Sequence, residues 1–83
     1  MEKEKKGKKK RSFPEFIKQI RGLIDDYEFQ RGIGLAYTGW KEKNKYRFKD
    51  GMALILMWLR LYNLDRYAPT MEEMSEWQEQ LSK

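Results

Sequence analysis

Apolar side chains between residues 13 and 27 recur every three or four positions, which is the period of one face of an amphipathic helix. Ser12 and Glu15 have the spacing of a capping box, and Pro14 falls in the first turn, where its missing N–H costs nothing. We therefore predict a helix over 13–30. Gly32 and Gly34 are expected to end it, one of them as a left-handed cap. The predicted stripe consists of Phe13, Phe16, Ile17, Ile20, Leu23, Ile24 and Tyr27.

Residues 33–48 fit two alternatives. Ile33, Leu35 and Tyr37 alternate as in a strand, and Tyr46 and Phe48 do so after a polar turn, so this segment can form a short β-hairpin. A helical stripe also fits, through Phe29, Ile33, Ala36 and Trp40, although each glycine in it would cost about 1 kcal/mol. We favour a short helical turn followed by an ordered loop.

A central apolar helix is predicted next. Asp50 reads as its N-cap, and the helix would run from Gly51 to Asn63 or Arg66. Because it is apolar on nearly every side, it must be surrounded. Trp58 and Leu59 are expected at the centre of the core, packed against the first helix. Two further helices cannot cover all of its faces, so a homodimer is a natural way to cover the rest.

A last helix begins after Ala68-Pro69, where the proline disfavours helical backbone in the residue before it. Thr70 and Glu73 form a second capping box, and a narrow apolar stripe follows. The predicted fold is thus mainly α, a small three-helix domain over residues 13–83. The stripe consists of Met71, Met74, Trp77 and Leu81.

The charge of the chain is concentrated at its N-terminus. The 83 residues hold 18 basic and 13 acidic side chains, net +5, and this whole excess lies in residues 1–12. So dense a run of like charges repels itself and buries no apolar surface, so we predict a disordered basic tail. Its side chains are suited to neutralise nucleic-acid phosphates; the alternatives are an anionic membrane surface, a nuclear localisation signal and a solubilising tail with no partner. The basic side chains are Lys3, Lys5, Lys6, Lys8, Lys9, Lys10 and Arg11.

A second basic segment, residues 41–49, carries five basic groups against one acid. Aromatic residues are interleaved with these charges, and aromatic faces stack on bases while Lys and Arg follow phosphates. So small a domain can hardly spare three large aromatic rings, so packing on the core, with only the charges facing water, is the favoured alternative. The predicted nucleic-acid contacts here are Lys41, Lys43, Lys45, Arg47, Lys49, Trp40 and Tyr46.

The composition argues against an enzyme. With no Cys and no His, thiol chemistry, imidazole catalysis and the usual zinc sites are excluded. Asp25, Asp26 and Glu28 do not share one helix face, so we expect no metal site, and no cofactor motif is present. The longest apolar run, 52–59, is too short to span a bilayer. We expect a cytoplasmic or virion-internal protein, or a nuclear one in a eukaryotic host.

Two functions fit these features. The first is a small, sequence-nonspecific nucleic-acid-binding protein, of DNA or RNA, of chromosomal, viral or mobile-element origin, that uses the tail and the 41–49 segment. The second is a protein-interaction module, for example a viral accessory or structural protein or an inhibitor of a host protein, that acts through the apolar and acidic helices. Salt-sensitive binding separates them, because phosphate contacts weaken as salt rises.

Overall fold

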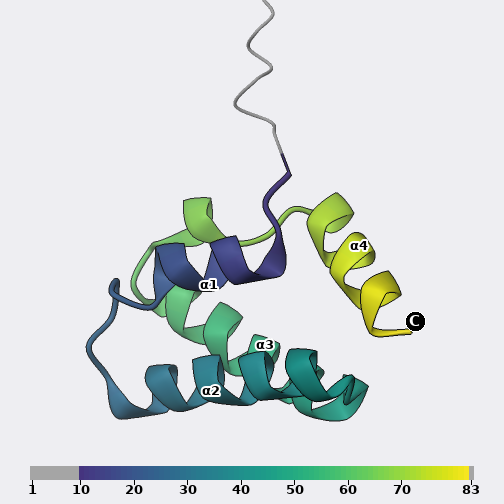
Figure 1. Ribbon diagram of the computed structural model, residues 1–83. Coiled ribbons are helices and arrows are strands. Elements are labelled where there is room, and N and C mark those ends of the chain that lie inside the picture. The colour runs from purple at the N-terminus through teal and green to yellow at the C-terminus, as the bar shows by residue number, and fades with distance from the viewer. Residues whose placement is uncertain (1–9, 83) are drawn as a thin grey trace, which may run out of the picture.

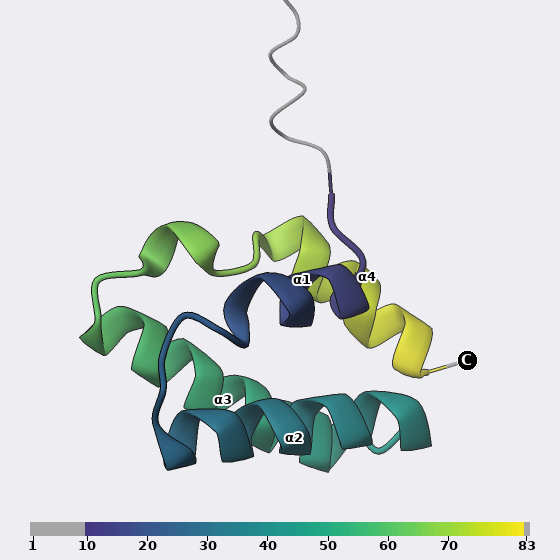
Figure 2. The same ribbon diagram turned by 60° about the vertical axis from the view of Figure 1, so that its left-hand side comes forward.

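The computed structural model describes residues 10–82, which form four α-helices and one short 3-10 helix and contain no strand. The helices are α1 (Phe13–Ile20), α2 (Tyr27–Glu42), α3 (Lys45–Leu61) and α4 (Met71–Leu81), with η2 (Asp65–Tyr67) between the last two. The mainly-α fold is confirmed, with four α-helices in place of three. Residues 1–9, most of the predicted tail, lie outside the described part of the chain. Figures 1 and 2 show α2 and α3 side by side, with α1, η2 and α4 on one side of this pair.

The predicted helix over 13–30 is wrong because the chain turns between Arg21 and Asp26. Ser12 and Glu15 form the predicted capping box, but α1 ends at Ile20. Asp26 then caps α2, since its carboxylate accepts the backbone N–H of Glu28 at 2.8 Å. Ile24 stays buried within the turn, so the apolar period continues across a break in the backbone.

The segment 33–48 forms no hairpin, and α2 runs straight through its three glycines. The helical stripe of Phe29, Ile33, Ala36 and Trp40 is confirmed, with Trp40 half-buried. Gly32 and Gly34 do not end the helix. Instead Lys43 supplies the left-handed residue after α2, with a φ of 58°.

The central helix begins six residues earlier than predicted. Asn44, not Asp50, is its N-cap, and its side-chain oxygen accepts the backbone N–H of Arg47 at 3.1 Å. The helix ends at Leu61 because Asn63 takes a left-handed conformation with a φ of 59°. The second capping box, Thr70 with Glu73, is confirmed at the start of α4.

The α2–α3 hairpin is held at close range by small residues. A Cβ atom placed on Gly51 would lie 2.6 Å from the carbonyl oxygen of Gly32 and 2.7 Å from the Cα of Ala36. A Cβ on Gly39 would meet the backbone of Phe48 in the same way. The two backbones therefore touch at successive turns, and their contacts run in opposite directions along the chain, as in an antiparallel hairpin.

The core is built around aromatic rings from every helix. Phe13 lies 4.9 Å from Trp40, 5.2 Å from Phe48 and 5.4 Å from Trp77, centroid to centroid. Leu59 is buried as predicted, but Trp58 is only half-buried, and Trp77 is the tryptophan that the core encloses. α4 therefore contributes directly to the core.

Candidate nucleic-acid interface

The second basic segment forms the corner where α2 meets α3. Only Lys43 and Asn44 separate the two helices, and the backbone N–H of Asn44 donates to the carbonyl of Gly39 at 2.8 Å. The predicted loop is thus the last turn of α2, a tight connection and the first turns of α3. We call this surface the basic corner. It comprises Lys41, Lys43, Lys45, Tyr46, Arg47 and Lys49.

The five basic side chains of this corner are all exposed. Arg47 pairs with Glu42 at 3.6 Å, and the Lys43 ammonium donates to the carbonyl of Gln80 at 3.1 Å. The Lys41 ammonium lies over the Tyr37 ring, 5.7 Å from its centroid. Each of these contacts lies at the surface, where such pairs contribute little, so they can be exchanged for contacts with phosphate.

The aromatic residues of this segment divide between core and surface. Phe48 is fully buried, and Trp40 is half-buried against Phe13. Tyr46, in contrast, is 83% exposed in the first turn of α3. Stacking by Trp40 would require its removal from the core cluster, so Tyr46 is the ring of this corner that can meet a base.

The first turn of α3 differs from those of the other described α-helices. An acidic residue stands in the first turn of α1, α2 and α4, where it complements the positive end of the helix dipole. The first turn of α3 has none and carries Lys45 and Arg47 instead. Positive side chains therefore stand at the positive end of the helix dipole, an arrangement that favours an anion.

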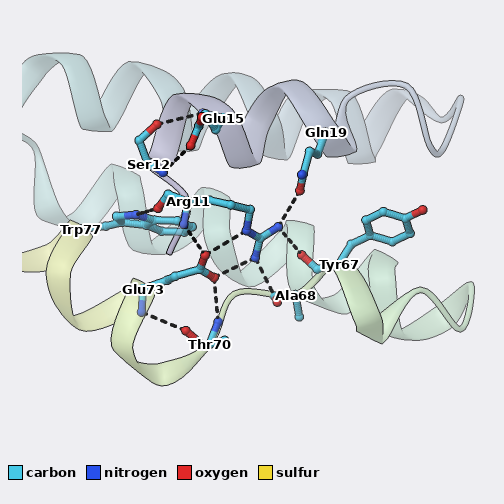
Figure 3. Close-up of polar contacts among 9 residues, drawn as sticks. All are labelled: Arg11, Ser12, Glu15, Gln19, Tyr67, Ala68, Thr70, Glu73 and Trp77. Carbon is cyan, nitrogen blue, oxygen red and sulfur yellow. Dashed lines mark hydrogen bonds and ion pairs between the residues drawn. The ribbon is translucent and has the colours of Figure 1, made fainter. Parts of the chain in front are cut away.

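Arg11 does not behave as a tail residue. Figure 3 shows its guanidinium bound to the Glu73 carboxylate by two hydrogen bonds. Nε donates at 2.9 Å and Nη2 at 2.7 Å. Its remaining N–H groups donate to the Gln19 side chain and to the carbonyls of Tyr67 and Ala68. All five donors of the guanidinium are thus used inside the protein, and Arg11 is corrected from a phosphate contact to a structural clamp.

Glu73 is the acid that makes this clamp strong. Its side chain is 3% exposed, and it also accepts the backbone N–H groups of Arg11 and Thr70. The hydrogen bonds from Arg11 lower the pKa of Glu73 to about 2, against the opposing effect of burial. The indole of Trp77 donates to the Arg11 carbonyl at 3.0 Å (Figure 3). Residues of α4 therefore bind both the backbone N–H and the backbone carbonyl of Arg11.

The other predicted tail contacts are placed differently. Lys10 is half-exposed and pairs with Glu76 at 3.6 Å, a surface pair that can open. The predicted contacts Lys3, Lys5, Lys6, Lys8 and Lys9 lie outside the described residues.

A shallow groove between α1 and α2 adds two cations that sequence reasoning missed. Lys18 and Arg21 line it together with Tyr37 and Gly34. In the sequence these two side chains read as the polar side of one long helix. Only the turn at 21–26, which folds α1 back over α2, reveals the groove, and no local signal in the sequence indicates it.

Two of the three carboxylates considered as a metal site have other partners. Asp26 caps α2, and Glu28 pairs with Arg31 at 3.4 Å. Within residues 10–82, no group of three or more acidic side chains is arranged to hold a metal ion. None of the helices described is long and apolar enough to cross a membrane.

Comparisons with known protein families, with curated proteins and with solved structures found no match to this chain. Function is therefore inferred from the geometry of its own residues.

Proposed function

We propose that this protein binds nucleic acid without sequence specificity, through the basic corner and the basic N-terminal residues. The observation that carries the proposal is the setting of Tyr46, a ring 83% exposed among five exposed cations. Tyr27 is almost as exposed, at 79%, but its neighbours Asp26 and Glu28 are acidic. An exposed ring among cations matches the combination that binds single strands, in which bases stack and phosphates are neutralised.

The shape of the site favours binding without base readout. Flexible lysines make point-charge contacts with phosphate, and such contacts position a nucleic acid without reading its sequence. A helix-turn-helix joins its helices at about 90–120° and offers one of them to the major groove. Here α2 and α3 form an antiparallel hairpin with backbone contacts along successive turns, so α3 does not stand out as a recognition helix.

The proposal is tested by the salt dependence of binding. Full-length protein is titrated into a labelled duplex of mixed sequence at several salt concentrations, and anisotropy gives the affinity. Replacing Lys43, Lys45 and Lys49 by Gln removes three phosphate contacts, which should flatten the slope of log affinity against log salt by about 2 to 3 on duplex DNA. The matched control replaces three exposed cations outside the corner, Arg31, Arg60 and Arg66, and should change the slope by less than 1.

The contribution of the N-terminus is measured with a deletion of residues 1–9. This deletion removes five lysines and keeps the structural Arg11, so it should flatten the duplex slope by about 4. Absence of measurable affinity of the full-length protein for DNA and RNA at low salt would refute the proposal.

A protein-interaction module is the second candidate, and one observation favours it. Met57, Leu61 and Tyr62 are 48%, 63% and 51% exposed near the end of α3. Apolar surface of this kind suits a protein partner more than a phosphate backbone. A stoichiometric protein complex that survives high salt, from a chain with no affinity for nucleic acid, would assign the function to this surface.

A further inference from the structure

The α2–α3 pair has one face that no other described element covers. α1, η2 and α4 all lie on its opposite side in both views (Figures 1 and 2). An apolar stripe follows the seam between the two helices on this free face. We call it the outer stripe: Leu35, Leu54, Trp58 and Leu61.

Two contacts show that the α2 and α3 sides of this stripe adjoin. A Cβ on Gly32 would lie 2.8 Å from the Cβ of Leu54, which places Leu54 directly on α2. Further along the seam, Arg47 and Glu42 are joined at 3.6 Å. Residues 35 and 42 are seven apart, as are 47 and 54, so each pair lies on one side of its helix.

The side chains of the outer stripe are only partly covered by the chain itself. Leu61 is 63% exposed, and Leu35 and Leu54 are half-buried. Trp58 packs on the core from this side, and its indole N–H is buried without a hydrogen-bond partner among the described residues. A continuous apolar strip of this kind on a small domain marks a contact surface.

The charges at the ends of the stripe indicate which partner fits. Glu28 and Arg31 pair at one end at 3.4 Å, and Glu42 and Arg47 pair at the other, where the exposed Asp50 adds a second acid. Each end thus carries charges of both signs. A strongly acidic or strongly basic partner would meet like charges as well as opposite ones, whereas a surface with both signs at both ends can complement itself.

We infer that the outer stripe binds a second copy of this chain in a symmetric dimer. In a two-fold contact the same patch serves both copies, and an antiparallel arrangement brings each end of the stripe onto the other end of its partner. Glu28 of one copy can then face Arg47 of the other, and Arg31 can face Glu42. The excess charge of the chain, net +5, lies elsewhere, so this near-neutral face is where two copies approach with least repulsion.

The dimer is tested on full-length protein freed of nucleic acid, by sedimentation equilibrium over a range of concentrations in moderate and high salt. We expect a species of twice 10.2 kDa that persists at high salt, because the stripe is apolar. Leu61→Glu should weaken dimerisation at least tenfold. Since Leu61 is 63% exposed, the variant should keep its circular dichroism spectrum. Leu61→Arg, of opposite charge, should act in the same way.

Met71→Glu is the matched control, since Met71 is 89% exposed in α4, away from the stripe, and its replacement should leave dimerisation unchanged. A wild-type chain that stays monomeric up to about 1 mM, the range of very weak binding, would overturn the inference. So would a dimer that both Leu61 variants leave intact. Contacts with a different protein, lost in Leu61→Glu from a monomeric chain, would assign the stripe to that partner and equally overturn it. The measurement contains no nucleic acid, so its result stands apart from that of the proposed binding function.

Discussion

Gly51 of α3 packs directly on the backbone of Ala36 of α2, at a distance that leaves no space for a side chain. An ideal Cβ on Gly51 would stand 2.7 Å from the Cα of Ala36 and 2.6 Å from the Gly32 carbonyl oxygen. Because these neighbours are backbone atoms of a helix, they cannot rotate away as a side chain can. The seam of the hairpin, and with it the position of the basic corner, depends on this contact.

Gly51→Ala should therefore separate α2 from α3. Overpacking a core usually lowers the free energy of unfolding by about 1–3 kcal/mol. A clash with backbone atoms should cost as much as the upper end of this range or more. Gly34→Ala is the control, because a Cβ at Gly34 meets nothing within 4 Å and alanine favours the helix by about 0.5–1 kcal/mol. Urea unfolding followed by circular dichroism should show opposite shifts of the two midpoints. Equal midpoints for both variants would contradict the close contact.

The Arg11–Glu73 clamp should make the free energy of unfolding depend on pH in the acidic range. The pKa of Glu73 is lowered in the folded protein to about 2, below its value near 4.3 in an unfolded chain. The unfolded state therefore takes up the proton first, so the contribution of Glu73 is complete above pH 4.3 and is lost as the pH falls towards 2. It amounts to about 3 kcal/mol. Glu73→Gln should flatten the pH dependence of the free energy of unfolding between pH 4.5 and 2.

Arg11→Lys separates the geometry of the clamp from its charge. Lysine keeps the positive charge but loses the planar, bidentate guanidinium and the hydrogen bonds to Gln19, Tyr67 and Ala68. The free energy of unfolding should therefore fall by about 2 kcal/mol. Arg31→Lys alters an exposed pair and should change stability by less than about 0.5 kcal/mol. Equal small losses in both variants, measured by urea unfolding, would show that the clamp contributes charge alone.

Trp58 and Trp77, two of the three tryptophans of the helical domain, should differ in the cost of their removal. Trp77 is 1% exposed and its indole donates to Arg11, so Trp77→Ala should cost about 3–5 kcal/mol. Trp58→Phe removes a buried N–H that has no partner, and its effect should lie near zero or be slightly stabilising. Thermal unfolding of both variants checks this order. A large loss of stability for Trp58→Phe together with a small one for Trp77→Ala would mean that Trp58, not Trp77, lies at the centre of the core.

Local signals predicted the parts of this fold that depend on neighbouring residues. Both capping boxes formed where their spacing indicated, since each needs only one side chain to reach a nearby backbone group. The turn at 21–26 escaped notice because the apolar period continues through Leu23 and Ile24. The glycines of α2 read as helix ends, and their role becomes visible only when α3 lies against them.

The candidate site was predictable in its charge but not in its shape. The basic residues 41–49 are exposed as the sequence indicated, whereas the assignment of its rings to core or surface depended on where α1 and α4 pack. Trp40 turned inward onto Phe13, and Tyr46 stayed in solvent. Arg11 left the set of expected contacts because its acid partner, Glu73, lies 62 residues away in the chain. Such long-range pairs have no signature in a single sequence.

Tyr46 provides the sharpest test of how the basic corner binds. If its ring stacks on a base, Tyr46→Leu should weaken binding to single-stranded oligonucleotides by about 1–3 kcal/mol, or roughly 5- to 150-fold, and should change duplex affinity much less. Tyr27→Leu is the matched control, since Tyr27 is almost as exposed as Tyr46 but lies beside acids, and it should leave both affinities unchanged. Anisotropy titrations with labelled single-stranded and duplex oligonucleotides measure both effects. An equal loss of single-strand affinity in the two variants would mean that the rings act through general apolar surface. Unchanged affinity in both variants would mean that the lysines alone make the contact.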